Sequence, residues 1–330
     1  MIQFEDLDLD QIVADVLAGA ELARPIARAL LDCPDDRLPD LLAATLKVRE
    51  AAFGRRVKIC MLRNAQSGIC PEDCSYCSQS RISKADIAVY KLQSVAQLVD
   101  GARSAVDNGA RRYCMVCSMR GPRDSDIEHL GEACERVRAE FPQLELCLSI
   151  GLTSRPQADA LKDAGAGWIN HNLNTSRRFY PQICSTHTWD DRVATIENVR
   201  AAGMNTCSGG IIGMGEEDDD ILDLAYATRR LAIDSVPINF LHPIKGTPLA
   251  AMRQLSPERC LKTACLFRLL NPFSEIRAAG GRELNLGVRQ PELFKAVNSI
   301  FVNGYLTTPG LASVPTQELI ERAGFEVEQG

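Results

Sequence analysis

The sequence of 330 residues predicts a (β/α)8 barrel with an N-terminal helical extension. Two patterns predict this fold: eight short apolar runs typical of buried strands, and amphipathic segments that alternate with them. No Pro/Ser-rich linker or low-complexity tract separates these patterns, so we expect one domain. We expect the helical extension over residues 1–52 and the barrel over residues 53–330; an open doubly wound sheet is the alternative.

The extension shows apolar residues at helical spacing on both sides of a break at Pro34 and Pro39. The expected strands of the barrel are Val57–Leu62, Arg112–Cys117, Leu144–Ile150, Trp168–Asn172, Asn205–Ile212, Val236–Leu241, Glu275–Ala279 and Ser299–Val302. The expected helices between them are Val95–Asn108, Ile127–Phe141, Pro156–Ala164, Trp189–Ala202, Asp219–Ala232 and Pro257–Leu270. Three of these helices would end at a glycine, the favoured residue at such C-caps, namely Gly109, Gly165 and Gly203.

The composition favours a soluble cytoplasmic protein. The chain carries a net charge of −6 and shows no basic stripe, so we expect no nucleic-acid partner. Its first residues are acidic rather than apolar, and no run of about 20 apolar residues could cross a membrane. Its 13 cysteines are many for a compartment that disfavours disulfides, and their odd number argues against complete pairing. Metal or redox chemistry is the natural explanation for several of them.

Three closely spaced cysteines carry the strongest chemical signal. Cys70, Cys74 and Cys77 have the spacing C-x3-C-x2-C, with Tyr76 directly before the last of them. Three thiolates on one short loop can hold three irons of a cubane iron–sulfur cluster, and no fourth cysteine lies nearby in the sequence. Because an electron-transfer ferredoxin uses four cysteines, this pattern predicts an open iron that binds and activates a ligand. A structural zinc loop is the alternative, but zinc needs a fourth ligand and usually two pairs of ligands.

Four further candidates fall on four different expected strands: Cys114, Cys147, Cys207 and Arg277. A (β/α)8 barrel carries its chemistry at the carboxyl ends of its strands, where the Cys70 loop would also lie. One buried cysteine is usually only a small apolar side chain. The shared placement of these residues beside a cluster loop instead predicts a second iron–sulfur cluster inside the barrel. Arg277 would be an unusual ligand, and a buried ion pair is the alternative for it.

Three asparagines alternate at the end of the fourth expected strand. If the chain stays extended there, Asn170, Asn172 and Asn174 share one face. Their amides both donate and accept hydrogen bonds, which suits a urea, a ribose or an amino acid. A turn is the alternative, because Asn is common in turns. Asn239, near the end of the sixth expected strand, could join them.

A glycine-rich segment follows the cysteine of the fifth expected strand. Gly209, Ile211, Gly213 and Glu216 read G-x-I-x-G-x-x-E, which is not a dinucleotide fingerprint. Glycines at a strand end let the backbone approach a ligand closely. The acidic run 216–220 that follows is expected to be a solvated helix N-terminus and not a metal site. Three histidines without clear partners are expected to be ordinary surface or core residues: His129, His187 and His242.

Taken together, these residues lie in motifs that resemble the biotin synthase family of the radical S-adenosylmethionine (SAM) superfamily, over about residues 40–325. The motifs are S-G-I-C-P-E-D-C-S-Y-C-S-Q-S (67–80), Y-C-M-V-C-S (113–118), N-H-N-L-N-T (170–175), N-T-C-S-G-G-I-I-G-M-G-E (205–216), V-P-I-N-F-L (236–241), I-R-A-A-G-G-R-E (276–283) and N-S-I-F-V-N-G-Y-L-T-T-P (298–309). The first motif marks the wider superfamily, and the order and spacing of all of them are specific to the family.

The resemblance implies a role for each candidate residue. A 4Fe-4S cluster that carries SAM would be bound by Cys70, Cys74 and Cys77. An auxiliary 2Fe-2S cluster would be bound by Cys114, Cys147, Cys207 and Arg277. Positions around the ureido ring of dethiobiotin match Asn170, Asn172 and Asn239. Positions that contact SAM match Tyr76, Asn172, Asn174, Gly209, Ile211 and Gly213.

The resemblance also implies the reaction and the partners. An electron from flavodoxin or ferredoxin would reduce the 4Fe-4S cluster, and SAM would be cleaved to methionine and a 5′-deoxyadenosyl radical. That radical would take hydrogen from dethiobiotin, and the resulting carbon radical would take sulfur from the auxiliary cluster. A second SAM would allow closure of the biotin ring. Iron–sulfur assembly proteins would load the chain, and a homodimer is the family expectation.

Three positions depart from the family pattern or add to it. Asn174 stands where some members carry Asp, which leaves a polar but uncharged contact. Cys117 would face away from Cys114 on a strand, unless the strand ends early and lets it reach the auxiliary site. Cys60, on the first expected strand, could face the barrel interior and add a ligand. The competing functions are a radical SAM enzyme for another small molecule, and an iron–sulfur redox sensor or electron carrier without an asparagine-lined pocket.

Overall fold

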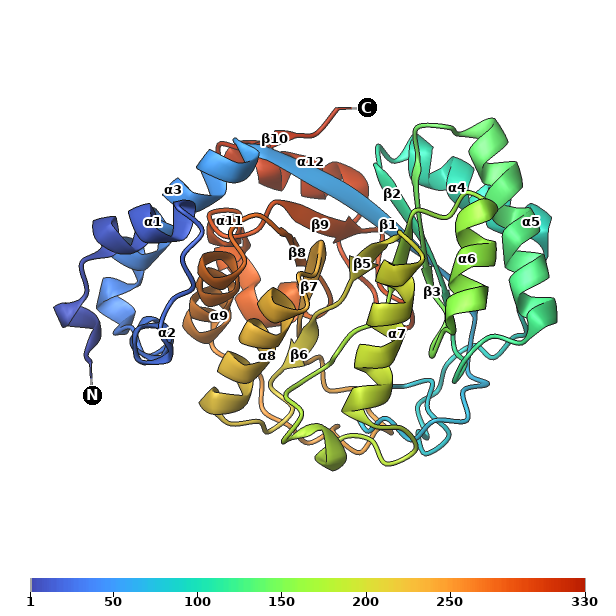
Figure 1. Cartoon of the computed structure of the whole chain (residues 1–330), viewed down its shortest axis with the longest axis horizontal. Coiled ribbons are helices and arrows are strands. Elements are labelled where there is room, and N and C mark those ends of the chain that lie inside the picture. The colour runs from blue at the N-terminus through green and yellow to red at the C-terminus, as the bar shows by residue number, and fades with distance from the viewer. Residues whose placement is uncertain (1, 330) are drawn as a thin grey trace.

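Eight strand positions close into a parallel barrel in the computed structural model, which describes residues 2–329 (Figure 1). The strands pair in the order β1-β2-β3-β4-β5-β7-β8-β9, and β9 pairs back to β1. Their bounds are β1 Arg56–Gln66, β2 Arg112–Cys117, β3 Glu145–Ser149, β4 Trp168–Asn170, β5 Asn205–Cys207, β6 Gly210–Ile212, β7 Ser235–Phe240, β8 Glu275–Ala278, β9 Ser299–Val302 and β10 Glu326–Val327. The short β10 pairs with the start of β1, outside the closed ring. The predicted fold class is confirmed.

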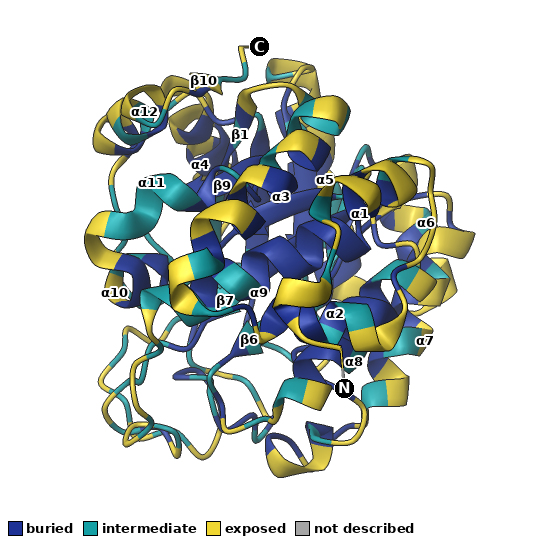
Figure 2. Cartoon of the chain, turned by 90° about the vertical axis from the view of Figure 1, so that its left-hand side faces the viewer, coloured by how far each residue is buried: buried dark blue, intermediate teal, exposed yellow. Residues whose placement is uncertain are grey.

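Helices cover the outside of the barrel, and their buried faces point inward onto the strands (Figure 2). They are α1 Leu9–Leu17, α2 Arg24–Leu31, α3 Leu38–Phe53, α4 Val95–Asp107, α5 Asp124–Glu140, α6 Arg155–Asp163, α7 Trp189–Ala201, α8 Asp218–Arg230, α9 Pro257–Leu270, α10 Arg282–Leu286, α11 Gln290–Leu293 and α12 Ser313–Arg322. Within residues 2–329, none of these helices is long and apolar enough to cross a membrane.

Local sequence explains where the helices begin and end. At the start of α4, the Ser94 side chain accepts a hydrogen bond from the backbone of Gln97, whose side chain bonds back to Ser94. The three helices that were expected to end at a glycine do so. Gly109, Gly165 and Gly203 adopt the left-handed conformation, with φ values of +73°, +97° and +72°. The helices α1 to α3 lie beside α8 and α9 (Figure 1), and their buried leucines join the same apolar core as the outer face of the barrel.

Two expected strands are shorter than the sequence suggests. The segment 205–212 forms two strands, not one, because the strand pairing is interrupted at Ser208 and Gly209. A Cβ atom on Gly209 would lie 1.9 Å from the carbonyl oxygen of Pro237, so only glycine allows this close backbone contact. The fourth strand ends at Asn170, two residues earlier than expected. The segment after it bonds across to this interruption, with the backbone of Asn174 joined to Gly209 and Ile211.

Parallel register stacks the inward-facing residues into layers. Arg112 lies opposite Glu145, and two residues further along Cys114 lies opposite Cys147. On the other side of the ring, Ser235 pairs with Glu275 and Arg277 pairs with Ser299. Because inward positions alternate along each strand, charged residues fill the base of the barrel, sulfur-bearing residues lie above them, and polar residues follow at the carboxyl ends.

Candidate active site

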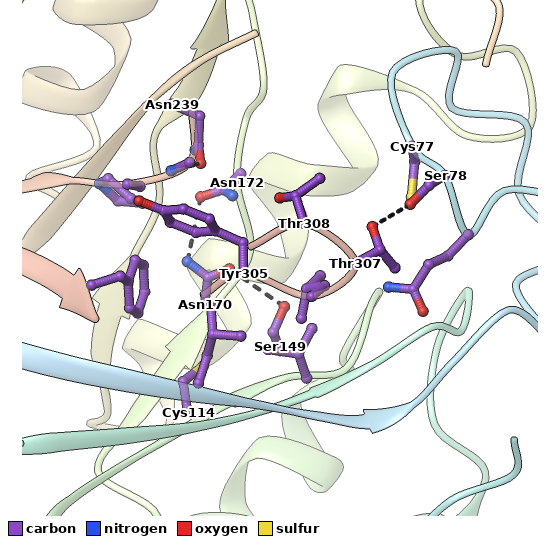
Figure 3. A pocket seen from close by; sticks show the side chains of 18 of the residues that line it. Cys77, Ser78, Cys114, Ser149, Asn170, Asn172, Asn239, Tyr305, Thr307 and Thr308 are labelled. Carbon is purple, nitrogen blue, oxygen red and sulfur yellow. Dashed lines mark hydrogen bonds between the residues drawn. The ribbon is translucent and has the colours of Figure 1, made fainter. Parts of the chain in front are cut away.

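A cavity of about 280 Å³ opens at the carboxyl ends of the strands (Figure 3). Its lining comes from several strands and from two long loops, as expected for a (β/α)8 barrel. Figure 3 shows Cys77, of the loop after β1, and Cys114, of β2, at opposite ends of the view, with asparagine, tyrosine and threonine side chains between them. The predicted site residues on this lining are Tyr76, Cys77, Cys114, Asn170, Asn172, Asn239 and Arg277.

The structure brings the four candidates of the auxiliary site together inside the barrel. Cys114 and Cys147 face each other across neighbouring strands, and the Arg277 Nη1 atom lies 3.5 Å from the sulfur of Cys207. The sulfur of Cys207 also accepts a hydrogen bond from Asn170 at 3.1 Å. All four residues are at most 5% exposed. A hydrogen bond to Cys114 and burial raise the pKa of Cys147, so the Cys147 thiol would release its proton when a metal binds.

Arg277 is fixed by the charged base of the barrel. Its Nε donates to Ser299 at 3.1 Å, its Nη2 donates to Ser235 at 3.0 Å, and it forms an ion pair with Glu275. Glu275 also accepts two hydrogen bonds from Arg112, at 2.9 and 3.2 Å. Burial favours the neutral carboxyl, but the cations Arg112, Arg277 and Lys58 hold the pKa of Glu275 well below its usual value.

Replacing Glu275 with Gln is expected to lower the free energy of unfolding by about 3–5 kcal/mol at pH 7, because two guanidinium groups lose their buried partner. Since the folded state lowers the pKa of this carboxyl, its stabilising effect is present above about pH 4.3 and is lost as the pH falls further. Denaturant unfolding at several pH values measures both effects. The control is Glu318→Gln, at an exposed pair with Arg322, which should change stability by less than about 1 kcal/mol. A loss in Glu275→Gln that stays constant down to pH 3 would contradict this account.

The Cys70 loop is anchored beside the cavity. Its backbone bonds to the segment before α7, where Ser75 donates to the carbonyl of Ile183 at 2.9 Å. Cys77 lines the cavity, Cys74 is buried against an apolar cluster, and Cys70 is partly exposed at the outer edge. Of the three cysteines, Cys77 alone therefore lines the cavity, while the sulfur of Cys74 lies against Cys184 and Cys70 is partly open to solvent.

Two of the three alternating asparagines point into the cavity. The Nδ2 of Asn170 donates to the Oδ1 of Asn172 at 3.3 Å, and that oxygen also accepts from the backbone of Gly209 at 3.1 Å. The expectation of one extended face is wrong for Asn174, which has a φ of +70° and donates to the hydroxyl of Tyr76 at 2.7 Å. Its short polar side chain tolerates this left-handed turn. Both polar atoms of the Asn239 side chain bond to the backbone. Its Nδ2 donates to the Gly210 carbonyl, and its Oδ1 accepts from the Gly280 amide.

The glycine-rich segment turns at Gly213, in a backbone conformation that favours glycine. Gly213 has a φ of +102°, and its amide donates to the carboxylate of Glu216 at 2.6 Å, as does Met214 at 2.7 Å. Glu216 thus stabilises the turn after β6. Ile211, on β6, is partly exposed. The expectation that the acidic run is solvated is wrong in part. Asp220 is buried and accepts from Ser176 at 2.5 Å, while the run does supply the first turn of α8.

The structure shows which of the two extra cysteines, Cys60 and Cys117, lies near the auxiliary site. Cys60 is fully buried inside the barrel, 3.3 Å from the Ser299 hydroxyl that also holds Arg277. Cys117 packs instead in the core between the strands and the helices, where burial raises its pKa to about 12. Cys60 is therefore a neighbour of the auxiliary site, and Cys117 is not.

Several residues of the site were missed by the sequence analysis. His187 is not an ordinary residue: it is buried and contacts Glu72, Cys184 and Arg192. Tyr305 and Thr307, from the loop after β9, also line the cavity. They come together only through the fold, since Glu72 and His187 are 115 residues apart in the chain. The sequence holds one signal that could have drawn attention to His187. The capping box of Thr188 and Asp191 marks the start of α7, and His187 directly precedes its N-cap, Thr188.

Comparisons with known proteins identify the family. Residues 66–225 match the model of the radical SAM superfamily, and residues 237–326 match the biotin and thiamin synthesis associated domain. The chain is 47% identical over 317 residues to a biotin synthase of Thermus thermophilus, covering 95% of this chain and 96% of that protein. The chain belongs to the biotin synthase family. It is also 44% identical over 313 residues to the biotin synthase of Bacillus subtilis, covering 95% and 93% of the two chains.

Solved structures of more distant proteins share the fold. A methylornithine synthase superposes with a TM-score of 0.83 at 20% identity and covers 96% of this chain and 97% of its own. The FeFe-hydrogenase maturase of Carboxydothermus hydrogenoformans superposes with a TM-score of 0.82 at 19% identity and covers 97% and 79%. At these identities the likeness concerns the barrel and not the substrate.

The thiols of the site fit the cofactors of the family. Radical SAM enzymes use SAM and a 4Fe-4S cluster, and biotin synthases carry an additional 2Fe-2S cluster. The structure offers two separate groups of cysteines, one on the Cys70 loop and one inside the barrel, and members of both line one cavity. Thiolates are the usual ligands of such clusters, so the donor atoms suit both of them.

Proposed function

We propose that the chain converts dethiobiotin to biotin by SAM-dependent radical sulfur insertion. One observation carries this proposal: a single cavity is lined both by Cys77 of the Cys70 loop and by Cys114 and Arg277 of the interior group. A radical formed at one end of such a cavity can reach a substrate held between two cofactors without meeting solvent. Membership in the biotin synthase family supports the choice of substrate.

Each cofactor has its proposed ligands. The 4Fe-4S cluster would be held by Cys70, Cys74 and Cys77, and the 2Fe-2S cluster by Cys114, Cys147, Cys207 and Arg277. When bound, the two clusters would supply the electron that cleaves SAM and the sulfur that enters the product. SAM would contact Tyr76, Asn172, Asn174, Gly209, Ile211 and Gly213, of which Tyr76 and Asn172 line the cavity. The ureido group of dethiobiotin would lie near Asn170, Asn172 and Asn239, which all line it.

The protein itself contributes uncharged polar side chains that can bind a ligand in a cavity shielded from solvent. The asparagine amides on the cavity wall suit an uncharged ureido group, whereas a carboxylate there would need a buried partner. Among residues 2–329, the Oδ1 atom of Asn172 has protein donors, and no protein acceptor is found for its Nδ2. This Nδ2 would donate to a carbonyl or hydroxyl oxygen of a ligand. Arg192 lies behind the Cys70 loop with neutral hydrogen-bond partners, and its charge would offset that of the thiolates.

Replacing Asn172 with Asp tests this donor. The carboxylate keeps the acceptor for Gly209 and Asn170 but replaces the Nδ2 donor with a negative oxygen. We expect the KM for dethiobiotin or for SAM to rise by at least about tenfold, the effect of about 1.4 kcal/mol or more. Steady-state kinetics with each substrate varied in turn measures the change. Asn198→Asp on α7, outside the cavity, is the matched control; an equal effect there would show that the donor is not specific.

Several features of the proposal concern partners and location. The electron donor would be a flavodoxin or ferredoxin that approaches the partly exposed Cys70, and iron–sulfur assembly proteins would deliver the clusters. We further propose a cytoplasmic homodimer in which residues 1–52 form a helical extension of the barrel at 53–330.

An anaerobic assay tests the proposed function. Reconstituted protein is supplied with reduced flavodoxin or dithionite, SAM and dethiobiotin, and the products are read by mass spectrometry. The proposal expects biotin together with 5′-deoxyadenosine. 5′-Deoxyadenosine without biotin, from protein with both clusters loaded, would instead favour a radical SAM enzyme for another small molecule.

A further inference from the structure

A second group of metal-ligating side chains lies directly behind the Cys70 loop. It joins Cys74 to Cys184 and His187, which come from the segment before α7. The three ligand atoms all lie within 4.8 Å of one another, and all three residues are buried. The group was invisible in the sequence, because 110 residues separate Cys74 from Cys184.

The distances in this group match those of a tetrahedral zinc site. The sulfur atoms of Cys74 and Cys184 are 3.8 Å apart, and the Cys184 sulfur is 3.4 Å from the Nδ1 of His187. In a tetrahedron with zinc–sulfur bonds of about 2.3 Å and zinc–nitrogen bonds of about 2.0 Å, these edges measure about 3.8 Å and about 3.5 Å. Two of the three donor pairs therefore already have the separations that one zinc ion requires, and the third pair lies within 4.8 Å.

A carboxylate and a cation flank the group. The buried carboxylate of Glu72 contacts the Nδ1 of His187 and accepts from Thr186 at 2.5 Å, and it is not one of the three atoms that already lie together. Once Nδ1 binds the ion, Glu72 loses this contact and can turn toward the ion as the fourth ligand. Two thiolates and one carboxylate around Zn²⁺ then leave one negative charge. Arg192 lies next to the ring of His187 at 2.8 Å and can balance that charge, since its other hydrogen bonds go to neutral oxygens.

Zinc binding releases the thiol protons of Cys74 and Cys184 to solvent and moves one further proton on the ring of His187. A guanidinium group only donates, so the Nε2 of His187 accepts from Arg192 in the metal-free chain and the Nδ1 carries the hydrogen that Glu72 accepts. When Nδ1 binds zinc, the ring hydrogen moves to Nε2, where the hydroxyl oxygen of Tyr180 lies 2.8 Å away as an acceptor. The Nη2 atom of Arg192 then turns aside, while its bonds to Tyr180 and to the carbonyl of Asn172 keep it in place.

The segment that carries the two new ligands is held against the loop without any metal. The carboxylate of Asp73 accepts from the backbone amides of Ser185 at 2.9 Å and Thr186 at 3.3 Å. Such support lowers the cost of bringing distant ligands together.

We propose that Cys74, Cys184, His187 and Glu72 form a mononuclear Zn²⁺ site in the chain that has not yet received its 4Fe-4S cluster. Because one thiolate cannot serve both, zinc at this site and the cluster on the Cys70 loop exclude each other. This exclusion rests on the proposed function, since it needs Cys74 to be a cluster ligand. Zinc binding itself does not.

Titration of the cluster-free full-length chain with Co²⁺, under reducing and anaerobic conditions, tests the site. Tetrahedral Co²⁺ with thiolate ligands gives intense visible bands and a sulfur-to-metal charge-transfer band, and added Zn²⁺ should bleach both. We expect Cys184→Ser and His187→Gln each to weaken Co²⁺ binding by more than about tenfold. Circular dichroism checks that each variant is folded. The two variants change different side chains, so each one tests the site independently.

The matched control is Cys70→Ser, which removes a cysteine of the loop that is outside the zinc group. It should bind Co²⁺ as the unchanged chain does. Co²⁺ binding that is lost in Cys70→Ser and kept in Cys184→Ser would overturn the proposal, because the metal would then sit on the C-x3-C-x2-C motif. No Co²⁺ binding to the folded chain would also overturn it.

A second experiment separates this inference from the proposed function. Excess Zn²⁺ should slow assembly of the 4Fe-4S cluster in the unchanged chain and not in Cys184→Ser, as followed by iron and sulfide content. Slowing in both chains would refute the exclusion at this site. A chain that binds Co²⁺ through Cys184 but assembles no cluster on the loop would leave the zinc site standing and refute the proposed function.

Discussion

Replacing Cys77 with serine is expected to abolish both 5′-deoxyadenosine and biotin formation. Cys77 is the thiol of the Cys70 loop that lines the cavity, so its loss removes one of three proposed ligands where SAM would be cleaved. Supporting contacts around metal sites already change metal affinity or activity by about 10–100-fold, and a direct ligand should cost at least about 100-fold. The measurement is the anaerobic assay of both products, together with the iron and sulfide content of the reconstituted variant.

Cys117→Ser is the matched control for this variant. Cys117 is buried, whereas Cys77 is partly buried, and Cys117 packs outside the barrel and away from the cavity. It should keep both products and the full iron content. Normal 5′-deoxyadenosine formation by Cys77→Ser would show that radical formation does not depend on the Cys70 loop.

Replacing Cys147 with serine is expected to separate the two products. Cys147 lies inside the barrel, 1% exposed and opposite Cys114, among the proposed ligands of the auxiliary cluster. Because the Cys70 loop is untouched, SAM cleavage should continue, while biotin formation should fall by at least about 100-fold. The ratio of 5′-deoxyadenosine to biotin in a single-turnover assay is the most informative quantity.

The control for Cys147→Ser is Cys134→Ser, a buried cysteine of α5 in the outer core. It tests whether a serine in any buried cysteine position disturbs the enzyme, and it should leave the product ratio unchanged. Loss of both products in Cys147→Ser, from a variant whose 4Fe-4S cluster is intact, would contradict independent roles for the two groups of cysteines.

Periodicity and local chemistry were sufficient to predict the barrel. Alternating apolar runs and helices predicted all eight strand positions, and glycine C-caps correctly marked three helix ends. Strand positions also indicated that Cys114, Cys147, Cys207 and Arg277 would meet, because parallel strands in register align their inward-facing residues.

The remaining errors come from contacts between segments that are distant in the sequence. The break between β5 and β6 follows from the close approach of Gly209 to Pro237, which no local pattern reveals. The left-handed turn at Asn174 depends on the same interruption, since its backbone bonds to Gly209. His187 acquires its role only when the segment before α7 packs on the Cys70 loop.

We propose above all that the auxiliary cluster held by the interior group of cysteines supplies the sulfur of the product. Protein reconstituted with isotopically labelled sulfide, then freed of excess sulfide, can be given dethiobiotin and SAM for a single turnover with unlabelled sulfur compounds present. The account predicts that mass spectrometry will find the label in the biotin formed, and that Cys147→Ser will form no labelled biotin. Unlabelled biotin from the labelled protein would contradict it, because the sulfur would then come from outside the barrel.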